Sequence, residues 1–161
     1  ELLDERLKDD IDVVLKAVQR SGLELKYASE RLKDHKVIVE AAFKNASSGL
    51  TYASFRIRDS DDIMLNFIAL DPSALSYASK RLRNNSRFML QALAIGDGVA
   101  QFIDSDLKDN EEFMLRAVRQ NALTIRDASE QLKSNQNFLL LAALHNPKVL
   151  YYINPFLIAC L

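Results

Sequence analysis

Hydrophobic residues recur along this chain on a short scale of three to four residues and again with a longer, 25-residue period. On the short scale, residues 113–115, 117 and 118 are all apolar. Placed on a helix of about 3.6 residues per turn, they cover more than half of the circumference. Because so wide an apolar surface must be covered from two sides, the pattern predicts helices sandwiched between neighbouring helices.

The long period becomes visible when the chain is aligned with itself. A leucine or isoleucine recurs at a constant interval without an insertion, at Leu7, Leu32, Ile57, Leu82, Leu107, Leu132 and Leu157. A basic residue follows each of the first six. A fixed period of this length is typical of repeat proteins. We therefore expect six full repeats, 7–31, 32–56, 57–81, 82–106, 107–131 and 132–156, between partial repeats at 1–6 and 157–161.

Each repeat is expected to contain a longer helix, a short helix and a connecting helical turn. In the fifth repeat the longer helix would span residues 111–120 after Asn110, whose side chain can accept hydrogen bonds from free backbone N–H groups. The pair Asp71-Pro72 is a typical start of the short helix. A capping serine such as Ser54 would then begin the turn that leads into the next repeat.

The predicted fold class is therefore all-α, an α-solenoid of six 25-residue helical repeats in a single array over residues 1–161. Stacked repeats bury each other's faces, so the recurring leucine, a recurring alanine and a recurring aromatic residue are expected in the core. The alanines are Ala28, Ala53, Ala78 and Ala128, and the aromatic residues are Tyr27, Tyr52, Tyr77, Phe102 and Tyr152. The aromatic series could instead form a wall on which a ligand stacks.

The repeat unit resembles that of a known family. The run from Leu107 to Asn110 and the pair Ala128-Ser129 follow the pattern of the short helical repeats catalogued as domain of unknown function family 4116. The resemblance covers residues 7–156 and is weakest at 96–106 and 151–156. It implies an array that forms part of larger proteins in intracellular bacteria and protists, some of them secreted effectors. No activity, catalytic residue or ligand comes with it.

Charge and composition favour a protein partner. The chain carries 21 Lys+Arg and 22 Asp+Glu, so no net basic field attracts nucleic acid, and a nucleic-acid partner is disfavoured. Cys160 is the single cysteine, which favours a reducing, cytoplasmic environment, or the host cytosol for an effector. The apolar run 138–144 is much shorter than the about 20 residues that cross a bilayer, so no membrane insertion is expected. Because the chain begins with Glu1, we expect a fragment of a longer protein.

No catalytic site, metal or other cofactor is expected. His35 and Cys160 lie five repeats apart, and His145 and Cys160 are separated by about the length of one helix. Paired carboxylates stand at helix starts, where they complement the helix dipole. Asp104 and Asp106 follow a glycine turn but lack the ligand order of a calcium-binding loop.

Two surfaces are candidates for binding a partner. On the polar side of the longer helices the third and fourth repeats carry apolar residues flanked by amides: Ala69, Leu70, Ala94, Ile95, Asn66 and Gln91. If adjacent repeats bring these together, they have the composition of an interface core with a polar rim. Burial under a loop or by the curvature of the stack is the alternative.

The second candidate is the basic ladder, the series Lys33, Arg58, Arg83, Lys108 and Lys133. It could bind an acidic partner. Aspartates directly follow the basic residue in four repeats, as Asp34 follows Lys33, so the ladder could equally form a solvated strip of ion pairs.

The expected function is that of a non-catalytic protein–protein interaction module whose partner is unidentified. The alternatives are a helical-repeat nucleic-acid binder and a structural arm of an enzyme whose catalytic domain lies outside this chain. A monomer is expected. Self-association could occur through the C-terminal end, where Leu141, Leu144 and the apolar residues 157–161 replace residues that are mostly polar in earlier repeats.

Overall fold

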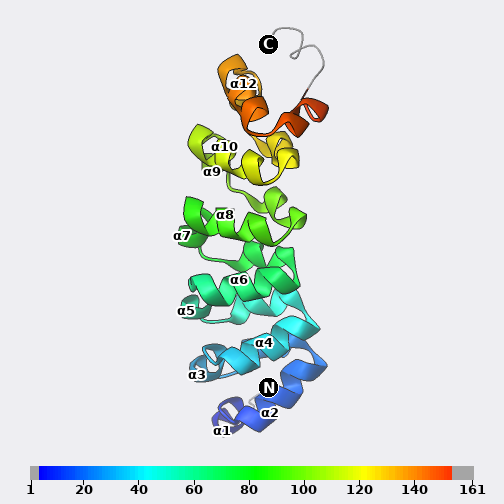
Figure 1. Ribbon diagram of the computed structural model, residues 1–161. Helices are drawn as coiled ribbons and strands as arrows, with labels where there is room; N and C mark the ends of the chain where they lie inside the picture. The colour runs from blue at the N-terminus through cyan, green and yellow to red at the C-terminus, as the bar shows by residue number, and fades with distance from the viewer. Residues whose placement is uncertain (1–3, 154–161) are drawn as a thin grey trace. The chain divides into compact units, whose positions relative to one another are not determined.

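A computed structural model describes residues 4–153 of the chain, apart from the side chain of Asp97 (Figure 1). Within this range every regular element is a helix. Six α-helices of ten residues, the long helices, follow one another with the 25-residue period: α2 (Ile11–Arg20), α4 (Lys36–Asn45), α6 (Asp61–Leu70), α8 (Ser86–Ile95), α10 (Glu111–Gln120) and α12 (Gln136–His145). The predicted span of 111–120 and the predicted period are both confirmed.

The predicted short helix is present as a 3-10 helix. These elements are η1 (Gly22–Tyr27), η2 (Ser47–Tyr52), η3 (Pro72–Tyr77), η4 (Asp97–Phe102), η5 (Ala122–Asp127) and η6 (Pro147–Tyr151). A 3-10 helix has three residues per turn, so residues three apart share one face. Gly22, Leu25 and Ala28 form such a face and are buried, whereas Leu23 and Lys26 are exposed.

The connecting helical turns are α-helices of four residues, as expected. They are α1 (Glu5–Lys8), α3 (Glu30–Lys33), α5 (Phe55–Arg58), α7 (Lys80–Arg83), α9 (Ser105–Lys108) and α11 (Glu130–Lys133). The serines before α3, α5 and α11 accept a hydrogen bond from the amide of the recurring leucine or isoleucine, as between the Ile57 amide and Ser54 Oγ at 3.2 Å.

Most of the expected caps of the long helices are also observed. Asp10, Asn85, Asn110 and Asn135 accept hydrogen bonds from amides of the first helical turn. Ser60, at the matching place before α6, is a residue type that often caps helices, but its side chain makes no capping bond.

The contacts divide the chain into two compact units, Glu1–Ser79 and Lys80–Leu161. In the first unit α2 and α4 lie side by side, and η1, η2 and η3 form a second row (Figure 1). The rings of Phe43 in α4 and Phe67 in α6 lie 4.7 Å apart. In the second unit α8, α10 and α12 form one row and η4, η5 and η6 another. Each unit is thus a two-row stack of helices joined by the four-residue helices.

The core of each unit contains the residues that recur with the period. The alanines Ala28, Ala53, Ala78 and Ala128 are 4% to 7% exposed, and Leu32, Ile57, Leu82, Leu107 and Leu132 are at most 5% exposed. Leu7 is exposed because no described repeat precedes it. Leu157, Cys160 and the apolar segment 157–161 lie outside the described residues, while Leu141 and Leu144 on α12 are exposed.

The tyrosines were wrongly expected in the core. Tyr27 and Tyr152 are exposed, and Tyr52 and Tyr77 are only half-buried. The cause is the 3-10 geometry: Tyr27 is two residues from Leu25, so it lies on another side of a helix with three residues per turn. No helix within residues 4–153 is long and apolar enough to cross a membrane.

Candidate functional site

The predicted apolar patch residues are exposed at the ends of two long helices. Ala69 and Leu70 end α6 in the first unit, and Leu70 is 64% exposed. Ala94 and Ile95 end α8 in the second unit, and both are exposed. The flanking amides, Asn66 and Gln91, lie one helical turn earlier, and both are exposed. Burial under a loop therefore does not occur among the described residues, and each unit presents its own part of the predicted patch.

Open hollows lie between neighbouring long helices. One, of about 420 Å³, lies between α2 and α4 and is lined by Leu15, Gln19, Val37, Glu40, Ala41, Lys44 and Asn45. A hollow of about 330 Å³ runs between α4 and α6 and has Leu70 and Lys44 on its wall. In the second unit, Arg116, Arg119 and His145 line a hollow of about 270 Å³ between α10 and α12.

Val37 is a surface residue that the sequence reasoning missed. It is 54% exposed and lines the hollow between α2 and α4. A signal was present, because the matching residues of the other repeats are polar: Asp12, Asp62, Arg87, Glu112 and Asn137. An apolar residue at a place that is otherwise polar indicates either a buried site or a binding surface, and the exposure of Val37 favours the second.

The basic ladder is largely engaged within the chain. Lys33 and Lys133 form ion pairs with Glu30 and Glu130 at 2.8 and 2.6 Å. Arg58 donates from Nε to the Ala53 carbonyl at 3.2 Å. Arg83 Nη1 lies 3.6 Å from Asp104 Oδ1, and Lys108 is half-buried.

At Lys33 the ion pair with the aspartate that follows it is not formed. Lys33 pairs with Glu30, three residues earlier, and Asp34 has other partners. The reason is geometric, since residues three or four apart face each other on a helix and adjacent residues do not.

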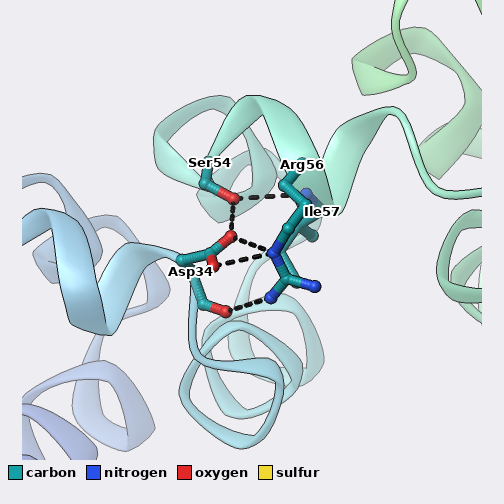
Figure 2. Close-up of polar contacts among 4 residues, drawn as sticks. All are labelled: Asp34, Ser54, Arg56 and Ile57. Carbon is teal, nitrogen blue, oxygen red and sulfur yellow. Dashed lines mark hydrogen bonds and ion pairs between the residues drawn. The ribbon is translucent and has the colours of Figure 1, made fainter.

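These aspartates belong instead to a repeated contact that we call the junction clasp. In it the serine before a four-residue helix donates its amide to the carbonyl of the basic residue that ends the preceding four-residue helix, and its hydroxyl to the aspartate that follows that residue. Figure 2 shows the clasp of Ser54, whose hydroxyl donates to Asp34. The Ser54 amide is 2.9 Å from the Lys33 carbonyl. Ser29 with Asp9, Ser79 with Asp59 and Ser129 with Asp109 make the same pair of bonds.

An arginine completes the clasp at the junctions before α3 and α5. Arg56 donates from Nε to the carboxylate of Asp34, at 2.8 Å to Oδ2, and from Nη2 to its carbonyl at 2.9 Å (Figure 2). Arg31 contacts Asp9 in the same way, with Nε 3.0 Å from Oδ1. The clasp connects the end of one four-residue helix to the start of the next, so it fixes the register between successive layers.

The clasp also changes the acidity of its aspartates. The hydroxyl of Ser54, and next the guanidinium of Arg56, lower the pKa of Asp34 below its usual value of 3.8. Ser29 and then Arg31 lower the pKa of Asp9 in the same way. Both groups donate to the ionised carboxylate, which favours the charged form.

Asp34→Asn is expected to lower the free energy of unfolding by about 1 kcal/mol at pH 7, since this ion pair is open to solvent. A lowered folded-state pKa stabilises the fold above pH 3.8, and this contribution is lost as the pH falls through the folded value. The difference in free energy of unfolding between the parent and Asp34→Asn, measured by urea unfolding, should therefore disappear as the pH falls below 3.8. In Ser54→Ala the pKa of Asp34, followed by NMR, should move upward. A gap that stays constant with pH would contradict this assignment.

The titratable residues outside the clasp include residue types that bind metal ions, among them the two histidines. Within residues 4–153 no group of three or more histidine, cysteine, aspartate or glutamate side chains could hold a metal ion. His35 Nδ1 is buried without a hydrogen-bond partner, and His145 lies beside Arg119 in the hollow between α10 and α12. Lys26 Nζ lies 4.4 Å from the ring centroid of Tyr27, which is a cation–π contact on the surface.

Comparisons with known proteins identify the repeat. No curated protein and no solved structure matches the chain at a significant level. The sequence profile of one family matches five overlapping segments, 1–33, 10–58, 60–108, 88–132 and 110–158. A full match is about two of the 25-residue periods long, so the family pattern spans pairs of the helical layers described above. Since the matches cover nearly the whole chain, it belongs to the family described as Domain of unknown function (DUF4116).

Proposed function

We propose that this chain is a non-catalytic, monomeric module that binds a protein partner through the outer surface of its long helices. One observation carries the proposal: large apolar side chains are exposed at places where most repeats have polar residues. Val37, Leu70, Ile95 and Leu144 are between 41% and 77% exposed. Val37 and Leu70 also line hollows between helices. Apolar side chains gathered beside grooves, with charged residues around them, are typical of protein-binding surfaces.

The distribution of charge supports a protein over a nucleic acid. Binding to nucleic acid depends on cations that are free to contact phosphates. The basic ladder is mostly engaged in ion pairs or carbonyl contacts within the chain, as for Lys33 and Arg58. On the outer surface Arg116 is paired with Glu112 at 2.9 Å. A nucleic-acid binder, and a structural arm of an enzyme or effector whose other domains lie outside this chain, are the alternative functions.

The decisive test compares the two candidate surfaces in a pull-down from native or host lysate. Leu70→Glu, Ile95→Glu and the double variant place charge on the exposed ends of α6 and α8. They are expected to lose the captured partner, because a carboxylate opposes burial of the apolar contact. Arg58→Glu/Arg83→Glu changes the basic ladder and is expected to retain it.

Two controls make the comparison interpretable. Circular dichroism should show that every variant is folded, and Ser76→Glu, an exposed substitution on η3, should bind like the parent. Loss of the partner in the ladder variant alone would assign binding to the basic ladder. Capture of nucleic acid that nuclease treatment abolishes would favour the nucleic-acid alternative.

A further inference from the structure

The junction that precedes α9 lacks the clasp found at other junctions. At the starts of α3, α5, α7 and α11 the serine amide lies 2.8 or 2.9 Å from the carbonyl of the basic residue that ends the preceding four-residue helix. The residue at the matching place before α9 is Asp104. Its amide makes no such bond to Arg83 within the described part of the chain, and its side chain does not cap α9. The backbone connection between successive layers is therefore missing at this junction.

The side chains at this junction cannot rebuild the clasp. Asn84 stands where the clasp has aspartate, and Asp106 stands where Arg31 and Arg56 donate. Both hydrogen-bond donors of the clasp, serine and arginine, are thus replaced by carboxylates. As a result Asn84 Oδ1 is buried without a hydrogen-bond partner. The remaining contact, Arg83 Nη1 to Asp104 Oδ1 at 3.6 Å, is longer than a hydrogen bond.

Within residues 4–153, the backbone at the start of η4 also lacks a hydrogen bond that other turns after a long helix have. The residue after a long helix usually donates its amide back to that helix, as Asn121 does to the Ala117 carbonyl at 2.9 Å. Gly96, after α8, makes no corresponding bond among the described residues. A Cβ atom added at Gly96 would meet nothing within 4 Å, so no neighbouring layer presses on this turn. The segment from Gly96 to Asp104 has lost polar contacts at both of its ends.

We propose that the segment 96–106 is a hinge inside the second unit, about which α8 and α10 change their relative orientation. Segments held by few hydrogen bonds open locally at a lower free energy than the whole fold. Apolar packing still connects the two sides, since Val99 and Ile103 are buried. Packing of this kind is non-directional, so it tolerates rotation better than a set of hydrogen bonds does. The hinge would change the spacing of the exposed surface around Gln91 and Ile95, and it does not depend on which partner binds there.

Hydrogen exchange on the whole chain tests the hinge. Amides of residues 100–107 are expected to exchange about tenfold faster than amides of residues 50–57, which span the intact clasp before α5. The repair variant Asn84→Asp/Asp104→Ser/Asp106→Arg installs the clasp. It should slow exchange in 100–107 to the rate seen in 50–57. Equal exchange of the two segments in the parent, or no slowing in the repair variant, would overturn the proposal.

A reciprocal variant and a distance measurement separate a hinge from simple local instability. Asp34→Asn/Ser54→Asp/Arg56→Asp transfers the defect to the junction before α5 and should speed exchange in 50–57. Spin labels at Gln91→Cys on α8 and Gln120→Cys on α10, in a Cys160→Ser background, should give a broad distance distribution in the parent. The distribution should narrow after repair. A narrow distribution in the parent would show that α8 and α10 are rigidly connected and would refute the hinge.

Discussion

Ala53→Arg is expected to lower the free energy of unfolding by at least about 3 kcal/mol, because it buries a charged group that has no partner. Ala53 follows η2 and is 5% exposed. Its counterparts in the neighbouring repeats, Ala28 and Ala78, are 7% and 5% exposed. Leu50 on η2 and Ile57 on α5, which precede and follow it in the chain, are fully buried. A guanidinium at this place must either push the layers apart or lose its hydration in an apolar site.

Urea unfolding followed by circular dichroism measures this loss. The matched control is Thr51→Arg, two residues earlier on η2 and exposed. It introduces the same side chain into solvent and should change stability by no more than about 0.5 kcal/mol. If both variants unfold at the same urea concentration as the parent, the layers do not meet at Ala53 as described.

Gly22→Ala is expected to destabilise the first unit by about 3 kcal/mol, although it adds a single methyl group. An added Cβ would lie 2.2 Å from the carbonyl oxygen of Ala42 in α4. That contact is with backbone, so no side-chain rotation can relieve it. The Gly22 amide also donates to Asn45 Oδ1 at 2.8 Å, so separating the layers would weaken a hydrogen bond between them.

Gly96→Ala provides the matched control for Gly22→Ala. Gly96 lies at the corresponding turn, directly after α8, but has open space around it. Its φ of 178° is extended backbone that any residue adopts, so alanine should be neutral or slightly stabilising. Thermal unfolding of the two variants is the measurement. Similar melting temperatures for both would mean that the close approach of η1 to α4 does not limit the packing.

The junction clasp shows which site features could have been found in the sequence. Aspartate, serine and arginine occur together at Asp9, Ser29 and Arg31, and again at the matching places one repeat later. At the junction before α9 all three are replaced together, by Asn84, Asp104 and Asp106. Because aspartate, serine and arginine occur together at some junctions and are replaced together at another, the sequence indicates that these residues contact one another. The sequence alone could not reveal the geometry, because the contacting residues come from successive four-residue helices about 20 residues apart, and this separation matches no local helical period.

The position and length of the long helices and the 25-residue period were determined by the sequence itself. The long helices have their own local signals: a wide apolar surface of period 3.6, a capping side chain such as Asn110, and glycine or proline after the end. Each of these signals depends on residues only a few positions apart, so it can be recognised without knowing which layers pack against the helix. The 3-10 helices carried a signal too, since Leu25 and Ala28 are three residues apart, but six residues are too few to distinguish that period from an α-helix.

The tertiary structure decided which polar groups are engaged and which apolar groups remain exposed. The sequence shows that Lys33 is basic, but not that it pairs with Glu30 and so is not free for a partner. It shows that Leu70 is apolar, but not that the side chain is exposed to solvent. Both outcomes depend on where the next layer lies, which follows from contacts between successive four-residue helices, such as that of Ser54 with Asp34. Hydrophobic burial is non-directional and fixes only that layers stack. Directional hydrogen bonds and the close backbone approach at Gly22 then fix how they stack, and those depend on positions in space that no local sequence pattern specifies.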